Sequence, residues 1–169
     1  MMMQIHRIEL PLKPSDKALL RVGDKVLLSG EIFTARDAAH ARLERLMITA
    51  QPLPFDLSET SLFYCGPSPK PEGKVCGAIG PTTSTRMDRY TPLLIDHGLR
   101  VMIGKGERSS TVKQSILSHH AVYMVCVGGV SALMAQSIVS CETYAWGELG
   151  AEAIYRLVVK DLPAYIAII

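Results

Sequence analysis

The chain has 169 residues, of which 48% are hydrophobic and 20% are charged, and its formal net charge at pH 7 is +2. This length supports one domain with its own core, residues 1–169, and is too short for two. The small net charge, with acids and bases interleaved, excludes the basic footprint of a nucleic-acid-binding protein. Apolar runs are shorter than a membrane span and the first residues lack a signal peptide, so we expect a cytoplasmic protein with neither nucleic-acid nor membrane partners.

The first half of the chain is expected to form a β-rich region with one long helix. Strands are predicted over residues 4–10, 25–33 and 62–65. Apolar side chains recur at helical spacing over residues 35–50, which predicts an amphipathic helix, and Pro52 prevents that helix from continuing. Residues 66–73 are rich in proline and predict a loop.

The second half of the chain alternates strand and helix signals. Strands are predicted over residues 74–79, 99–103, 121–127, 155–159 and 164–169. Helices are predicted over residues 85–97, 110–119 and 130–139, with a turn at residues 160–163. Strands separated by helices of these lengths favour right-handed crossover connections, so the sequence predicts an α/β fold with a largely parallel sheet.

Two arginines, Arg36 and Arg86, are each expected in the first turn of a helix that follows a strand. A helix N-terminus carries a partial positive charge, so a cation there costs a few tenths of a kcal/mol. In both segments a threonine precedes an acid by three residues, which resembles a capping box and supports the predicted helix starts. The pairs are Thr34 with Asp37 and Thr85 with Asp88. A local rule broken at a helix cap often indicates a functional site.

Hydroxyls and a third cation are expected close to these arginines. Thr82 and Thr83 lie just before Arg86, and Lys105 lies between two glycines after a predicted buried strand. Ligands of parallel sheets bind at the carboxyl ends of strands, so these residues predict one shared site for a small polyanion. Three separate solvated loops are the alternative. The spacing around Lys105 fits neither a P-loop nor a dinucleotide-binding fingerprint.

The cysteines do not predict a metal centre on this chain. They lie mostly in apolar, strand-like surroundings and show no C-x-x-C spacing, so we expect buried, reduced thiols. The four residues are Cys65, Cys76, Cys126 and Cys141.

Nearly the whole chain resembles one enzyme family. The most specific segments are residues 80–88, with the sequence GPTTSTRMD, and residues 102–106, with MIGKG. They resemble the β subunit of two-component class I fumarases and L(+)-tartrate dehydratases, and equally the C-terminal domain of single-chain versions. Further matching segments are residues 23–24, 28–30, 34–40, 64–67, 128–129 and 148–163.

The resemblance implies a swivelling β/β/α three-layer domain of an iron–sulfur hydro-lyase that interconverts fumarate and malate. It implies a [4Fe-4S] cluster on a partner α subunit, no cofactor bound by this chain, and a heterotetramer or dimer that is active only with that subunit. An L(+)-tartrate dehydratase β subunit is the close alternative. A non-catalytic dicarboxylate-binding module is an alternative of a different class.

The same resemblance implies roles for the candidate residues. Arg36 and Arg86 would bind carboxylates, and arginine suits this because its planar guanidinium pairs bidentately with a carboxylate. Thr82 would lie near the carbon that loses its proton, with Thr83 and Lys105 completing the substrate-binding set. A threonine hydroxyl is a poor base unless a neighbour activates it. Lys105 is therefore the candidate catalytic partner of Thr82, and a purely orienting role for Thr82 is the alternative.

Overall fold

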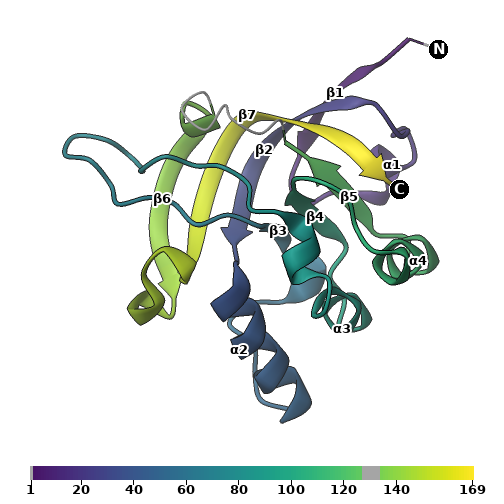
Figure 1. Ribbon diagram of the computed structural model, residues 1–169. Helices are drawn as coiled ribbons and strands as arrows, with labels where there is room; N and C mark the ends of the chain where they lie inside the picture. Colours follow the sequence, from purple (N-terminus) through teal and green to yellow (C-terminus); the bar gives the residue numbers. More distant parts are fainter. Residues whose placement is uncertain (1, 127–133) are drawn as a thin grey trace.

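The computed structural model describes residues 2–126 and 134–169, which form one mixed α/β domain (Figure 1). Seven strands in this described part share one sheet, in the order β1-β2-β3-β4-β5-β7-β6. Their bounds are β1 Ile5–Glu9, β2 Lys25–Thr34, β3 Ser61–Phe63, β4 Val101–Gly104, β5 Val122–Val125, β6 Ile138–Ala145 and β7 Ile154–Ile168.

The sheet closes into a five-stranded barrel because β7 pairs with both β5 and β2. Strands β1 to β5 run parallel to their neighbours, as the sequence predicts, whereas β7 is antiparallel to β2, β5 and β6. The extra strands β1 and β6 extend the barrel along β2 and β7. The parallel part of the sheet therefore places the carboxyl ends of β2, β3 and β4 side by side.

Helices cover the outside of this barrel. Figure 1 shows α2, α3 and α4 along one side of the sheet. Adjacent strand residues contribute to two different apolar clusters: Val101 and Ile103 pack in the cluster that lines the barrel interior, and Met102 packs against the helices. The bounds are α1 Pro14–Lys17, α2 Asp37–Ile48, α3 Thr91–Asp96 and α4 Ser110–Ser118, with 3₁₀ helices η1 Leu57–Glu59, η2 Ser84–Met87 and η3 Gly147–Glu152.

Two sequence predictions in the middle of the chain are wrong. Residues 74–79 form no strand; they belong to a long loop that folds back on itself through hydrogen bonds between Ser68 and Ala78. The predicted helix over residues 85–97 is divided into η2 and α3. Pro92 lies in the first turn of α3 and lacks the amide that a continuous helix would need, so α3 begins at Thr91.

Near the C-terminus, β7 is one continuous strand where two strands and a turn are expected. The pairing with β2 shifts between Leu28 and Gly30, and Asp161 adopts a positive φ of 52°. This bulge absorbs the turn-like composition of residues 160–163 without ending the strand. The predicted helix over residues 130–139 lies partly outside the described residues, and its last two positions, Ile138 and Val139, begin β6.

Among the described residues, the helices are too short or too polar to cross a membrane.

Candidate functional site at the strand ends

The carboxyl ends of β2, β3 and β4 meet at one edge of the sheet. The Ala35 amide donates to the Phe63 carbonyl at 3.0 Å, and the Tyr64 amide donates to the Ile103 carbonyl at 2.9 Å. These bonds hold the residues that follow each strand in register. Arg36 after β2 and Lys105 after β4 therefore lie at the same edge.

The segment from Pro81 to Arg86 crosses this edge. The Thr82 amide donates to the Tyr64 carbonyl at 2.6 Å, and Thr83 forms a β-bridge with Lys105. The next amide, of Ser84, donates to the Lys105 carbonyl at 3.0 Å. Backbone contacts therefore join the segment of Thr82 and Thr83 to the turn that carries Lys105. We call Arg36, Thr82, Thr83, Arg86 and Lys105 the strand-end cluster.

Arg36 occupies the N-cap position of α2, just before the first turn in which the sequence predicts it, and its side chain is half-buried. Its Nε atom is buried and has no hydrogen-bond partner among the described residues. The side chain passes over Gly66, where an added Cβ would lie 2.7 Å from Arg36 Cδ and 2.5 Å from the carbonyl oxygen of Ala151. Only glycine leaves room for Arg36 there, and a buried N–H donor without an acceptor is costly unless a ligand supplies one.

The cap of α2 comes from a distant residue, so the predicted capping box is wrong. Glu152 Oε1 accepts a hydrogen bond from the Ala38 amide at 3.0 Å. Thr34 instead accepts from the Tyr155 amide at 3.0 Å and does not cap the helix. The acidic charge that a helix N-terminus favours is thus supplied across 114 residues of sequence.

Arg86 lies in the 3₁₀ helix η2, so the prediction of a regular helix start at this residue is wrong. Its Nη2 atom is 2.7 Å from Asp37 Oδ2, and 52% of the Arg86 side chain is exposed. Asp37 is the first residue of α2 and directly follows Arg36. The ion pair therefore links the segments that carry the two arginines.

The remaining cluster residues differ in exposure. Thr82 and Lys105 are half-buried, and Thr83 is exposed. Beneath them, the buried Ser84 hydroxyl accepts from the Lys105 amide at 3.1 Å and lies 2.7 Å from the Tyr123 hydroxyl. Burial raises the pKa of Tyr123 to about 12, so this phenol stays protonated and acts as a support for the turn.

A second group of residues, centred on the buried Arg108, supports the segments that carry the site. Arg108 Nε is 2.7 Å from Asp88 Oδ1, and Nη2 donates to Thr91 at 2.8 Å and to Tyr64 at 3.2 Å. The guanidinium also lies over the Tyr123 ring at 4.7 Å. We call these five residues the Arg108 cluster. Arg108 was not a candidate from sequence, because Asp88 was assigned to a capping box and no local pattern indicates a buried ion pair.

His40 is a further buried residue that the sequence prediction missed. Its Nδ1 donates to the Arg36 carbonyl at 2.9 Å, and its Nε2 has no partner among the described residues. Burial lowers the pKa of His40 to about 4, so the ring is neutral at pH 7. The helical spacing could have indicated its burial, since His40 lies on the buried side of α2 together with Ala39 and Leu43.

The chain's thiols do not fit an iron–sulfur cluster. Cys65, Cys76 and Cys126 belong to the barrel-interior core, and Cys141 packs against it. Burial raises the pKa of Cys76 and of Cys126 to about 12, which disfavours the thiolate form that metals bind. No group of three metal-ligating side chains occurs in the part of the chain that the structure describes.

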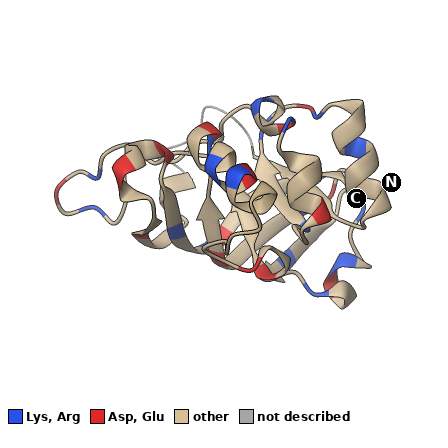
Figure 2. Ribbon diagram, turned by 90° about the horizontal axis from the view of Figure 1, so that it is seen from below, with Lys and Arg blue, Asp and Glu red and all other residues tan. Residues whose placement is uncertain are grey.

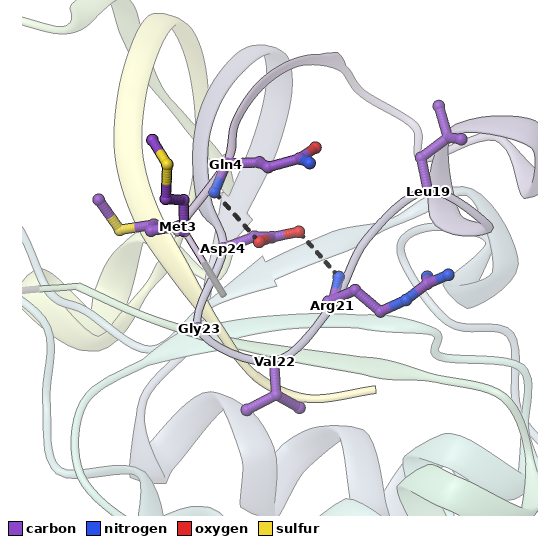
Figure 3. Close-up of a pocket in the computed structure, with 8 residues that line it drawn as sticks. Met3, Gln4, Leu19, Arg21, Val22, Gly23 and Asp24 are labelled. Atoms are coloured by element: carbon purple, nitrogen blue, oxygen red, sulfur yellow. Dashed lines mark hydrogen bonds between the residues drawn. The ribbon is translucent and has the colours of Figure 1, made fainter.

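A hollow beside β1 lies apart from the strand-end cluster. Basic and acidic residues are interspersed along the chain (Figure 2). A hollow of about 370 Å³ beside β1 is lined by Met3, Leu19 and Val22, and its one acid, Asp24, already accepts from the Arg21 amide at 2.9 Å (Figure 3). None of the strand-end cluster lines this hollow.

Known proteins match this chain over most of its length. A family model described as Fumarase C-terminus matches residues 2–169. The Fumarate hydratase class I, anaerobic, of Escherichia coli is 40% identical over 149 residues, 87% of this chain and 27% of that protein. Fumarate hydratase 2 of Leishmania major is 38% identical over 87% of this chain and 26% of its own length. The chain thus spans about a quarter of these relatives.

A shorter relative is covered over most of its length. The Putative L(+)-tartrate dehydratase subunit beta of Methanocaldococcus jannaschii is 36% identical over 155 residues, which are 89% of this chain and 80% of that subunit.

Proposed function

Because the chain belongs to the Fumarase C-terminus family, we propose that it provides the carboxylate-binding and proton-transfer residues of an iron–sulfur hydro-lyase that interconverts fumarate and malate. The observation that carries this proposal is the buried Nε of Arg36, which lacks a partner among the described residues and lies at the same strand edge as Thr82 and Lys105. A carboxylate supplies the acceptor that this donor needs.

Arg36 and Arg86 bind the two ends of the substrate in this proposal. A C4 dicarboxylate carries two charged groups, and two guanidinium groups fix both ends and therefore the orientation of the carbons between them. Arg36 approaches from β2 and Arg86 from η2, so the substrate lies across the segment that contains Thr82 and Thr83. Lys105 adds positive charge where negative charge develops on the substrate.

Thr82 is the proposed proton-transfer residue. Its backbone is fixed by the 2.6 Å hydrogen bond to the Tyr64 carbonyl, which limits the positions its hydroxyl can take. Lys105 is held next to Thr83 by the β-bridge and is the proposed partner that favours loss of the Thr82 proton. A role of Thr82 in orientation alone is the alternative within this proposal.

We propose that a partner α subunit holds a [4Fe-4S] cluster, because the thiols described here are unsuited to it. Such a cluster would supply a Lewis acid for the substrate hydroxyl. The substrate would then lie between the two subunits in a heterotetramer or dimer. A swivelling movement of a three-layer domain is the proposed means of closing that site.

L(+)-tartrate is the second candidate substrate. The supporting observation is that this chain covers 80% of a protein named as a tartrate dehydratase β subunit. Tartrate and malate are both C4 dicarboxylates with a hydroxyl to be removed, so the same cations serve both. A binding module without catalysis is the third candidate.

Turnover by the protein as it occurs in its source tests these proposals. The complex that co-purifies anaerobically with this chain should dehydrate L-malate or L-tartrate, and its larger component should contain the iron. The separated chain should contain no iron and show no dehydration. A complex that binds a C4 dicarboxylate without turning it over supports the binding module, and substantial activity of the chain alone would overturn the division between subunits.

A further inference from the structure

We propose that Asp37 is a positioning residue, which holds Arg86 in the orientation that binds a substrate carboxylate and so lowers KM. The inference rests on the proposed function, because it assigns Arg86 to carboxylate binding. Asp37 itself contacts no reacting atom in this account. It acts only through the guanidinium of Arg86.

The geometry of the ion pair carries this inference. Asp37 Oδ2 lies 2.7 Å from Nη2 of Arg86, and no second contact between these side chains occurs among the described ion pairs. A guanidinium has five N–H donors, so one engaged nitrogen leaves an edge of Arg86 available for a ligand. An arginine held in this way has a defined orientation and keeps N–H donors for a ligand.

Asp37 is a firm point of attachment. It is the first residue of α2, where the partial positive charge of the helix favours a carboxylate, and the neighbouring Ala38 amide is capped by Glu152. Arg86, in contrast, belongs to a short 3₁₀ helix and is half-exposed. The pair therefore ties the more exposed arginine to the helix that begins beside Arg36.

Two physical effects make this attachment useful. Ordering a free arginine side chain on binding costs rotamer entropy, and an ion pair made beforehand removes part of that cost. The Asp37 carboxylate also offsets one of the three positive charges of Arg36, Arg86 and Lys105. The remaining charge matches a dianion.

The expected signature is a change in KM. A substrate carboxylate that does not react is bound equally in the ground and transition states, so misplacing Arg86 weakens binding without slowing chemistry. In the active complex, Asp37→Ala and Asp37→Asn should raise KM about tenfold for L-malate or L-tartrate, whichever is turned over, and leave kcat within about threefold. Asp37→Glu should recover most of the loss, because it restores the charge.

A double-mutant cycle separates positioning from a general effect on α2. When Arg86→Lys is already present, Asp37→Ala should change KM less than twofold, because the residue through which it acts is gone. Glu148→Gln is the matched control: Glu148 of η3 pairs with Arg42 of α2 at 2.6 Å and not with Arg86 among the described ion pairs, so its loss should leave KM and kcat unchanged. Thermal unfolding of each variant records any loss of helix stability.

The outcomes are distinct. A tenfold rise in KM that disappears in the Arg86→Lys background supports the inference. An active wild-type complex with an unchanged KM for Asp37→Ala, a lowered KM, or effects that multiply with those of Arg86→Lys would overturn it and leave the proposed function standing. A wild-type complex that turns over neither substrate removes the proposed function, and this inference with it.

Discussion

Arg108 and Arg36 lie within the same group of strand ends, yet their surroundings differ. Arg108 has a fully buried side chain that pairs with Asp88 and donates to Thr91 and Tyr64. Arg36 is half-buried, and its Nε has no acceptor among the described residues. Both cations follow parallel strands. The described residues supply hydrogen-bond acceptors for Arg108 but none for Nε of Arg36.

This difference assigns Arg108 a structural role and Arg36 a role in binding a ligand. A buried cation with all its partners within the chain stabilises the turn that carries Lys105 and has nothing left to offer a ligand. A cation with an unsatisfied donor keeps that capacity, and the folded chain bears the cost until an acceptor arrives. The predictions below follow from assigning the Arg108 cluster to the fold and the strand-end cluster to the substrate.

The largest effect is expected from Arg108→Ala. Removing this side chain leaves Asp88 as a charge without its partner, so the free energy of unfolding should fall by about 3 to 5 kcal/mol. Urea denaturation measures this change. Arg89→Ala is the control, since Arg89 is exposed and lies only over the Tyr90 ring. A loss below about 1 kcal/mol for Arg108→Ala would remove the distinction between the two clusters.

Thr82→Val should act on chemistry and spare the fold. Valine keeps the shape of threonine and deletes the hydroxyl, so kcat of the complex should fall by about 10²- to 10⁴-fold with little change in KM. Steady-state kinetics with the substrate that the complex turns over measures both constants. A rise in KM with unchanged kcat would reduce Thr82 to substrate orientation.

Arg86→Lys should weaken transition-state binding and leave stability unchanged. Lysine keeps the charge but loses the bidentate geometry, which should cost about 2 to 4 kcal/mol in kcat/KM. The unfolding curve should match that of the wild type, because the side chain of Arg86 makes one exposed ion pair among the described residues. An unchanged kcat/KM would exclude Arg86 from the site.

His40, which lies between the two clusters, should make stability depend on pH. Its pKa in the folded chain is about 4, below the 6.5 of an ordinary histidine, so the unfolded chain binds the proton more readily. The contribution is complete above about pH 6.5 and is lost as the pH falls toward 4, with about 1 kcal/mol lost between pH 7.5 and 5.5.

The check is the slope of unfolding free energy against pH in wild type and in His40→Gln. The other histidines are present in both proteins, so their contributions cancel. The slope should be shallower in the variant. Equal slopes would show that His40 is not held neutral by burial.

The sequence predicted those elements whose signal is local. Local patterns identified β1, β2, β4, β5, α2 and α4: alternation in β1, buried apolar runs in β4 and β5, and helical spacing in α2. Residues 74–79 carry a strand-like pattern, but they bury Cys76 and Ile79 without joining the sheet. The apolar pattern of residues 74–79 correctly indicates buried side chains. Whether such a segment pairs with a neighbouring strand depends on the tertiary structure.

At the site, too, the sequence predicts residues that break a local rule but not their tertiary partners. Arg36 was found because a cation at a helix start breaks a local rule, and the structure places it there. Arg86 was found by the same rule, although it lies in a 3₁₀ turn and pairs with Asp37. The side-chain oxygens that Arg108 contacts belong to residues 17 to 44 positions away in sequence, so no spacing rule could have indicated them.

The most direct test of the central claim, that Arg36 binds a substrate carboxylate, is NMR spectroscopy of arginine Nε–H groups in the active complex, with this chain alone ¹⁵N-labelled, during titration with L-malate. Sodium chloride at the same ionic strength is the reference. The account predicts that the Arg36 signal moves, while the Arg108 signal, whose Nε is held 2.7 Å from Asp88, stays in place. An Arg36 signal that does not move, or one that moves equally with chloride, would contradict the account.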